Sequence, residues 1–206
     1  MEPAVYLVDD DAGVRDAVTF LLEAEGIRVV SAASPDELLG KVTPENRGCL
    51  LLDVRLPGMN GLELQQVLRE RRVRMPVIFI SGHGDIPMAV RAVNEGALDF
   101  LEKPFKDAQL LEKIRNAMTL DAVEQEEIAR RGEVEERLQT LTPREREVLE
   151  GILEGKLSKV IAWEMEVSVR TVEVHRAHVI EKLGARNTSE LVRLVLSTST
   201  YRNWLL

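Results

Sequence analysis

The sequence predicts two folded parts. Residues 1–118 are expected to form an α/β domain with a doubly wound, five-stranded parallel sheet, and residues 141–206 a smaller all-α domain. Two observations predict the first part: five short apolar runs alternate with five helical patterns, and acidic residues directly follow two of those runs. The second part is predicted because only helical patterns follow residue 118.

The five strand candidates are short and apolar almost throughout, which is typical of strands buried on both faces of a parallel sheet. They cover residues 5–8, 28–32, 49–52, 77–80 and 99–101. Apolar residues at helical spacing predict helices over 14–22, 35–42, 62–68, 88–93 and 110–118. Ser34-Pro35 favours the start of the second helix, and the Gly58–Gly61 string predicts a turn before the third.

Four further helices are predicted between residues 141 and 196. Residues 142–145 (Thr-Pro-Arg-Glu) are a strong helix start, with Thr as cap, Pro first and Glu third. Ser158 is expected to cap a short second helix, and a third runs over 169–183 and stops at Gly184. Asn187 is expected to cap the fourth.

Charge is distributed unevenly along the chain. The net charge is −8, but residues 141–206 hold ten Lys/Arg and nine Asp/Glu, so the rest carries about −9. This balance argues against a protein that coats nucleic acid in general. Residues 119–140 hold seven acids and three bases with high helix propensity, and we interpret them as a charged helical linker. A partly disordered linker fits the same composition.

Cysteine usage and hydropathy exclude several classes of protein. The single cysteine, Cys49, lies in an apolar run, so an intramolecular disulfide and a cysteine-rich metal site are excluded. No apolar stretch approaches the roughly 20 residues that a membrane span needs. The N-terminus lacks the basic start and apolar core of a signal peptide. A cytoplasmic protein without a membrane partner is expected.

Charged side chains follow three of the predicted strands. Asp9 and Asp10 follow the first, Asp53 the third, and Lys103 the fifth. In such sheets, ligands bind outside the carboxyl ends of the strands. Crowded carboxylates repel one another unless a cation lies among them. The sequence therefore predicts a site for a hard divalent metal, Mg²⁺, beside a reactive aspartate. His83 is interpreted as a loop histidine, because no partner lies at metal-ligand spacing.

The set Asp9-Asp10, Asp53, Ser81 and Lys103-Pro104, in this order, resembles the receiver domain of two-component response regulators, which has a flavodoxin-like fold. The strings that begin at Asp53 (Asp-Val-Arg-Leu-Pro-Gly-Met-Asn-Gly) and at Ser81 (Ser-Gly-His-Gly-Asp-Ile-Pro) are similar to those of the NarL/FixJ class in particular.

The resemblance implies a role for each of these residues. Asp53 would accept the phosphoryl group, and Asp9, Asp10, Asp53 and the backbone carbonyl of Arg55 would form the Mg²⁺ site. Mg²⁺ and Lys103 would neutralise charge on the transferring oxygens. Ser81 would donate a hydrogen bond to the phosphoryl group, Phe100 would be the aromatic switch residue, and Lys103-Pro104 would be cis.

Residues 141–196 resemble the LuxR-type helix-turn-helix domain, through Leu-Thr-Pro-Arg-Glu at 141–145, Val-Arg-Thr-Val-Glu-Val-His-Arg at 169–176 and Lys-Leu-Gly at 182–184. The helix over 169–183 would enter the major groove of DNA. Its residues Val172, Val179 and Leu183 share one face and are predicted to be buried.

The exposed residues around this helix are the candidates for DNA contacts. Glu173, Val174 and Ala177 are placed for base edges, although Glu173 equally fits a solvated helix acid. Arg170, Thr171, Arg176 and Lys159 are placed for phosphates. Because the net charge of residues 141–206 is low, a dimer on two half-sites is expected.

These resemblances imply a transcription factor, not a conventional enzyme. A sensor histidine kinase would phosphorylate Asp53, and the chain would then bind promoter DNA as a homodimer, with RNA polymerase as a further partner. A Mg²⁺-dependent aspartate phosphatase is the opposing hypothesis. Such enzymes carry a second Asp two residues after the nucleophile, where this chain has Arg55. A third hypothesis is a receiver that only stores phosphate. Neither the phosphatase nor the phosphate store explains residues 141–206. Dinucleotide binding fails, because no Gly-x-Gly-x-x-Gly opens the first helix.

Overall fold

The computed structural model describes residues 2–82 and 86–201, with only the backbone described for 86–89. His83 lies outside these residues. The chain divides into two compact units, residues 1–125 and 126–206. No helix in the described part of the chain is long and apolar enough to cross a membrane.

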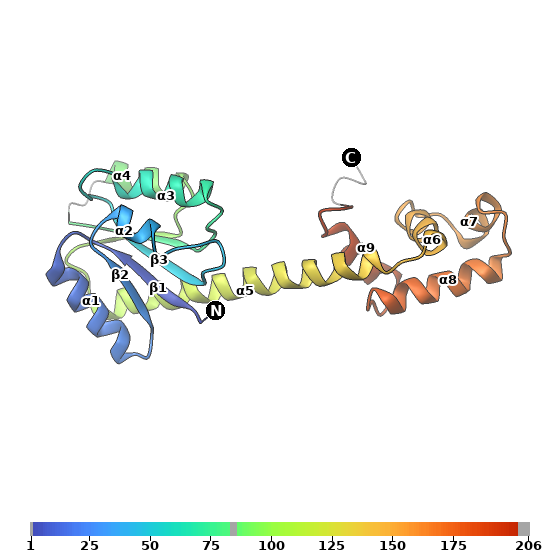
Figure 1. The fold of residues 1–206 in the computed structure, drawn as a ribbon, viewed down its shortest axis with the longest axis horizontal. Helices are drawn as coiled ribbons and strands as arrows, with labels where there is room; N and C mark the ends of the chain where they lie inside the picture. Colours follow the sequence, from blue (N-terminus) through green and yellow to red (C-terminus); the bar gives the residue numbers. More distant parts are fainter. Residues whose placement is uncertain (1, 83–85, 202–206) are drawn as a thin grey trace. The chain divides into compact units, whose positions relative to one another are not determined.

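The first unit is a five-stranded parallel sheet with helices on both faces, which confirms the predicted fold class (Figure 1). Its strands are β1 (Ala4–Val8), β2 (Val29–Ala32), β3 (Gly48–Asp53), β4 (Val77–Ser81) and β5 (Asp99–Glu102). The helices between them are α1 (Ala12–Ala24), α2 (Pro35–Leu39), α3 (Gly61–Glu70) and α4 (Ile86–Asn94), and α5 (Asp107–Gln139) follows β5.

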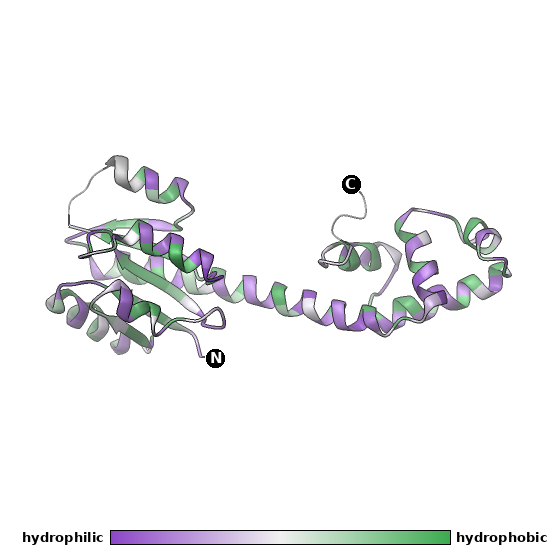
Figure 2. Ribbon diagram, turned by 45° about the horizontal axis from the view of Figure 1, so that its top comes forward, coloured by the Kyte–Doolittle hydropathy of each residue, from purple (hydrophilic) through white to green (hydrophobic). Residues whose placement is uncertain are grey.

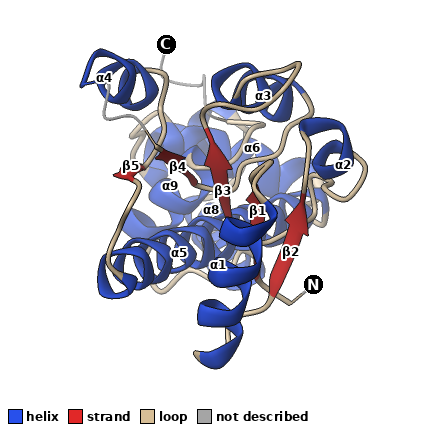
Figure 3. Ribbon diagram, turned by 90° about the vertical axis from the view of Figure 1, so that its left-hand side faces the viewer, coloured by secondary structure: helices blue, strands red, loops and turns tan. Residues whose placement is uncertain are grey.

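Two apolar layers hold the sheet between its helices. Side chains alternate along each strand, so Leu50 and Leu52 face one layer while Leu51 faces the other. The first layer packs against α2, α3 and α4, and the second against α1 and α5 (Figure 3). Because both faces are covered, β1, β3 and β4 are buried along their whole length.

The strand order is β2-β1-β3-β4-β5, so the chain reverses its direction of winding between β1 and β3. At such a switch point the connections leave on opposite faces and open a crevice at the carboxyl ends of the two strands. Val8 lies opposite Leu52 in the β1–β3 register, so Asp9 and Asp53 come next to each other at that edge. The topology therefore sets where the predicted pocket must lie.

Helix α5 belongs to both units. It runs from Asp107 to Gln139 without a break. The sequence of residues 119–140 was compatible with either a helical or a partly disordered linker. The buried Asp121 carboxylate accepts a hydrogen bond from the Gly48 N–H at 2.9 Å, which fixes the helix to β3. Near the other end, Val134 and Leu138 are buried in the core of the second unit. Between Asp121 and Val134, most residues of α5 are hydrophilic (Figure 2).

The second unit packs four short helices around one apolar core: α6 (Pro143–Leu153), α7 (Ser158–Glu164), α8 (Val169–Lys182) and α9 (Thr188–Leu196). Thr142 and Glu145 form the predicted capping box of α6, and the Asn187 side chain accepts from the Glu190 N–H as predicted. Val172, Val179 and Leu183 are buried, which confirms the predicted inner face of α8.

One predicted cap is wrong. Leu157 is the N-cap of α7 and makes no side-chain cap, while Ser158 is the first helical residue. The neighbouring turn between α7 and α8 also contains a feature that the sequence did not reveal. Glu166 adopts a left-handed φ of 55°, which costs a non-glycine residue about 1 kcal/mol. The sharp reversal that it provides lets Val167 turn back toward the core before α8 begins.

Candidate functional site

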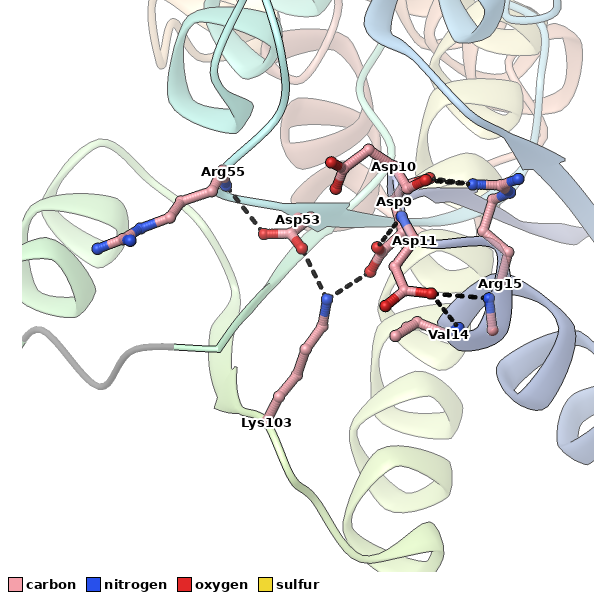
Figure 4. Close-up of polar contacts among 9 residues, drawn as sticks. Asp9, Asp10, Asp11, Val14, Arg15, Asp53, Arg55 and Lys103 are labelled. Atoms are coloured by element: carbon pink, nitrogen blue, oxygen red, sulfur yellow. Dashed lines mark hydrogen bonds and ion pairs between the residues drawn. The ribbon is translucent and has the colours of Figure 1, made fainter.

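The carboxyl ends of β1, β3 and β5 bring together the charged residues predicted from the sequence (Figure 4). Lys103 Nζ lies 2.5 Å from Asp9 Oδ2 and 2.6 Å from Asp53 Oδ2, so one ammonium bridges carboxylates from two strands. Asp53 Oδ1 accepts a hydrogen bond from the Arg55 N–H at 2.8 Å. The Asp53 side chain is thus oriented from both sides, with 9% of its surface exposed.

Asp10 completes a group of three acids. Ligand oxygens of Asp9, Asp10 and Asp53 all lie within 4.8 Å of one another. Carboxylate oxygens at this spacing suit a hard divalent cation such as Mg²⁺, which takes oxygen ligands at about 2.1 Å. The donor set therefore fits Mg²⁺, and Asp10 is exposed to solvent.

The charges of this cluster are not balanced by the protein alone. Burial raises the pKa of the Asp9 carboxyl above its ordinary value, and hydrogen bonds from Lys103 and the Asp11 N–H oppose the rise only in part. Burial also disfavours the charge on Lys103, but hydrogen bonds to Asp53 and Asp9 together raise its pKa. Three carboxylates share one ammonium, which leaves room for a divalent cation.

Two further predicted residues lie at the same end of the sheet. Ser81 is the last residue of β4, is fully buried, and pairs in register with Glu102; its backbone carbonyl accepts from the Lys103 N–H at 2.7 Å. Phe100, on β5, is half-buried against the layer that faces α4. Lys103-Pro104 is cis, as expected.

Residues that the sequence did not single out shape this site. A Cβ on Gly61 would lie 2.3 Å from the Asp53 carbonyl oxygen, so only glycine allows α3 to begin this close to β3. Arg15 Nη1 donates to the carbonyl oxygens of Asp9 and Asp10 at 2.8 and 3.0 Å, which fixes the loop that carries both acids. Asp11 is the N-cap of α1 and stands outside the cluster. Only the Gly58–Gly61 turn gave a signal in the sequence.

The second candidate surface is the outer face of α8 with the start of α7. Most of the predicted DNA contacts are exposed, and these are Lys159, Arg170, Glu173, Val174 and Ala177. Two are partly engaged within the unit. The Thr171 N–H donates to the Ser168 cap at 3.1 Å, and Arg176 Nη2 lies 3.4 Å from Thr188 Oγ1. Arg176 therefore reaches toward the start of α9.

A third site, within the second unit, was not predicted to be functional. Glu145 has only 5% of its side-chain surface exposed and binds Lys182 Nζ at 2.6 Å, while it also accepts from the Thr142 N–H and hydroxyl. Burial opposes its charge, yet the hydrogen bonds from Lys182 and Thr142 lower its pKa to about 2. The Glu145 carboxylate thus accepts all of these hydrogen bonds from donors of the protein itself.

The first unit is a parallel sheet with an acidic pocket at its switch point, and the second is a small helical unit; together they define a class of regulators. Residues 5–115 match the family described as "Response regulator receiver domain", and residues 139–195 match "Bacterial regulatory proteins, luxR family". The chain belongs to the two-component response regulators that combine a receiver with a LuxR-type DNA-binding domain, as the sequence predicted.

Proteins similar to this chain carry the names of regulators. The chain is 44% identical over 192 residues to "Transcriptional regulatory protein FixJ" of Azorhizobium caulinodans, covering 93% of this chain and 91% of the relative. It is 41% identical over 190 residues to "Response regulator protein TodT" of Pseudomonas putida, covering 92% and 84%.

Two solved structures extend over nearly the whole chain. The response regulator StyR matches with a TM-score of 0.81 and 39% identity, covering 95% of this chain and 98% of StyR. Full-length FixJ from B. japonicum matches with a TM-score of 0.59 and 38% identity, covering 96% and 97%. These relatives carry names of regulators, so the phosphatase hypothesis has no support among them.

Proposed function

We propose that this chain is a transcription factor activated by phosphorylation of Asp53 from a sensor histidine kinase. The observation that carries the proposal is the position of Asp53. It lies at the end of β3, held between the Lys103 ammonium and the Arg55 N–H, and shares a pocket with Asp9 and Asp10. A carboxylate can attack a phosphoryl group only where cations offset the repulsion between two anions.

Asp9, Asp10, Asp53 and the backbone carbonyl of Arg55 would hold Mg²⁺. When bound, the metal neutralises charge on the phosphoryl oxygens. Lys103 already contacts the attacking carboxylate and would hold one phosphoryl oxygen as a point charge. The Ser81 hydroxyl would donate to another, and Phe100 would change its packing with the phosphorylation state. The reactions that the protein itself would catalyse are only the gain and the loss of this phosphoryl group.

The chain would work in three parts: residues 1–118 as receiver, 119–140 as a charged helical linker, and 141–206 as the DNA-binding domain. The burial of Val134 and Leu138 in the second core supports a linker whose end is fixed to the DNA-binding part. The phosphorylated chain would act as a homodimer at promoter DNA in the cytoplasm, with RNA polymerase as its further partner.

Helix α8 would enter the major groove, with its buried residues fixing its position against α6 and α7. Glu173, Val174 and Ala177 would face base edges. Arg170, Thr171, Arg176 and Lys159 would bind phosphates and so set the orientation of the helix without reading sequence. A regulator with this division of labour needs both half-sites of a dimer for tight binding.

Intact-protein mass spectrometry after incubation with Mg²⁺ and a small phosphodonor tests the phosphoacceptor. Wild type is expected to gain one phosphoryl group and Asp53→Asn none. Asp16→Asn, on the exposed side of α1, is the matched control and should behave as wild type. An unchanged phosphoryl gain in Asp53→Asn would remove Asp53 from its role.

DNA footprinting with and without the phosphodonor tests the second half of the proposal. Phosphorylation is expected to tighten binding and to raise the solution mass to that of a dimer. Arg170→Ala should weaken binding to all sequences about equally and reduce the salt dependence, whereas Val174→Ala should change the preferred bases. If Val174→Ala, like Arg170→Ala, weakened binding equally for every DNA sequence, the assignment of Val174 to base edges would be contradicted.

A further inference from the structure

The end of α5 and the end of α8 meet within the second unit (Figure 1). Arg137, in the last turn of α5, donates from Nη1 to the carbonyl oxygen of Leu183, the C-cap of α8, at 3.3 Å. Lys182, the last residue of α8, donates from Nζ to the carbonyl oxygen of Thr140, just after α5, at 3.4 Å. Each helix thus provides a cation for the carbonyl end of the other, where the helix dipole favours positive charge.

Other contacts hold the same end of α5 against the second unit. Val134 and Leu138 are buried in its core, and Arg146 Nη2 donates to the Leu138 carbonyl oxygen at 3.1 Å. Glu135 accepts from the N–H of Ser199, beyond the end of α9, at 2.6 Å. The last turns of α5 therefore pack as part of the second unit.

Arg137 adds a directional contact to this packing. Burial of apolar surface is non-directional, whereas a hydrogen bond weakens steeply when its angle changes. Among the described residues of α5, only Arg137 makes a side-chain hydrogen bond to α8 or its cap. Its Nη2 pairs with Glu133, one turn earlier, at 2.6 Å, so the pair leaves Nη1 on the Leu183 carbonyl and holds the guanidinium from the other side.

The chain ends α8 in a way that lets the Arg137 guanidinium lie on its backbone. Gly184 follows the C-cap and has a left-handed φ of 67°. A Cβ at this position would lie 2.0 Å from Arg137 Nη1. A larger residue would therefore displace the guanidinium as well as strain the backbone. Gly184 was predicted as a helix stop, and the close approach of Arg137 is a second reason for glycine here.

We propose that Arg137 is a positioning residue that fixes the direction of α5 relative to α8 and thereby sets which spacing of two DNA half-sites the dimer can bind. The inference rests on the proposed function, in which the phosphorylated chain binds DNA as a homodimer through α8. The separation of two half-sites must match the separation of the two recognition helices. Because α5 continues without a break into the first unit, its angle to α8 is one of the quantities that determine this separation. A fixed angle favours one spacing, whereas a loose joint allows several.

Binding to DNA duplexes of varied half-site spacing tests the proposal. The two half-sites are first selected from random duplexes with the phosphorylated full-length chain, and their separation is then lengthened or shortened by one to five base pairs. Wild type is expected to prefer one spacing. Arg137→Met should bind the duplex with this spacing about fivefold more weakly, as for loss of one hydrogen bond, because a smaller fraction of the dimer has the matching arrangement. Its affinity for the other duplexes should not fall.

Three further variants separate the contact from the charge. Arg137→Lys keeps a cationic donor near Leu183 and should restore most of the spacing preference. Gly184→Ala should relax the preference although Arg137 is intact, because the methyl group displaces the guanidinium. Arg130→Met is the matched control and should behave as wild type. Arg130 is exposed two turns earlier in α5, and among the described residues it makes no side-chain hydrogen bond or ion pair.

Equal weakening of Arg137→Met at every spacing overturns the proposal, as does a wild type that binds every spacing alike. A smaller folded fraction would weaken all duplexes equally, and urea unfolding of the variant would reveal it. A direct contact of Arg137 with a DNA phosphate would also weaken all duplexes equally. It would in addition lower the slope of log affinity against log salt concentration by about 1 in the variant, which positioning does not.

A measurement without DNA separates the failure of this proposal from the failure of the proposed function. Nitroxide labels on Ala129→Cys and Glu173→Cys, exposed on α5 and α8, report the distance between the two helices, while the native Cys49 is buried. The distance distribution is expected to be narrow with Arg137 and broad in Arg137→Met, and equal widths overturn the proposal. If wild type binds no duplex in the presence of the phosphodonor, the proposed function fails, and the label distances still decide whether Arg137 fixes α5.

Discussion

The Asp9–Asp53–Lys103 cluster of the first unit and the Glu145–Lys182 pair of the second both place a lysine ammonium 2.5 to 2.6 Å from a buried carboxylate. They differ in what else surrounds the charge. Glu145 is one carboxylate with one ammonium and two donor groups of Thr142. Asp9 shares its ammonium with Asp53, and Asp10 adds a third carboxylate.

The pKa shifts of the two carboxylates have opposite directions. Burial opposes the charge in both clusters, but the hydrogen bonds of Glu145 outweigh it and lower its pKa to about 2. At Asp9 burial prevails, and the pKa is raised. A site whose charges are balanced internally stabilises the fold, whereas a site with surplus charge has the capacity to bind something else. The comparison therefore separates a structural salt bridge from a chemical site on physical grounds.

The largest expected effect tests the surplus charge. Asp10→Ala should weaken Mg²⁺ binding about a hundredfold, because one of three carboxylate ligands is lost. Asp11→Ala is the matched control. It removes the N-cap of α1, which costs about 1 kcal/mol of stability, but should leave Mg²⁺ affinity unchanged. Titration of each variant with Mg²⁺ measures the difference, and equal affinities in Asp10→Ala and wild type would contradict the metal site.

The next effect compares the two lysines directly. Lys182→Met leaves the Glu145 charge buried and should cost about 2 kcal/mol at pH 7, with or without Mg²⁺. Lys103→Met should also destabilise the metal-free protein, but added Mg²⁺ should stabilise it more than wild type, because the cation replaces the lost ammonium. Urea unfolding at several Mg²⁺ concentrations decides this. A Mg²⁺-independent loss in both variants would remove the distinction between the clusters.

The smallest effect concerns pH. The pKa of Glu145 is about 2 in the folded protein and ordinarily 4.5, so its charge stabilises the fold above pH 4.5 and this contribution is lost as pH falls toward 2. Glu145→Gln should cost on the order of 1 to 2 kcal/mol at pH 7, because the exposed Lys182 can return to water. The gap between variant and wild type should close between pH 4.5 and 2. A gap that stays constant over this range would show that the charge of Glu145 contributes nothing.

Local patterns were sufficient for much of the fold. The capping box of Thr142 and Glu145, the cap at Asn187 and the buried face of α8 depend on residues three or four apart, and the structure has them as predicted. The α7 cap was wrong because a serine before a short helix fits the first helical position as well as the cap position, and packing decides between them. Neither the continuity of α5 nor the burial of Val134 and Leu138 followed from the irregular apolar spacing of that segment.

The sequence by itself determined the alternation of strands and helices, the second helical unit, and the placement of Asp9, Asp53 and Lys103 after strands. These features could be predicted because strand ends and helix caps depend on residues that are neighbours in the chain. Only the tertiary structure decided how these side chains meet. The order β2-β1-β3-β4-β5 brings Asp9 and Asp53, which lie 94 and 50 positions before Lys103, onto one ammonium. The pairing of Glu145 with Lys182 joins α6 and α8, which are separated in the chain by α7. Contacts between distant residues depend on how chain segments pack, and the spacing of residues along the chain does not contain that information.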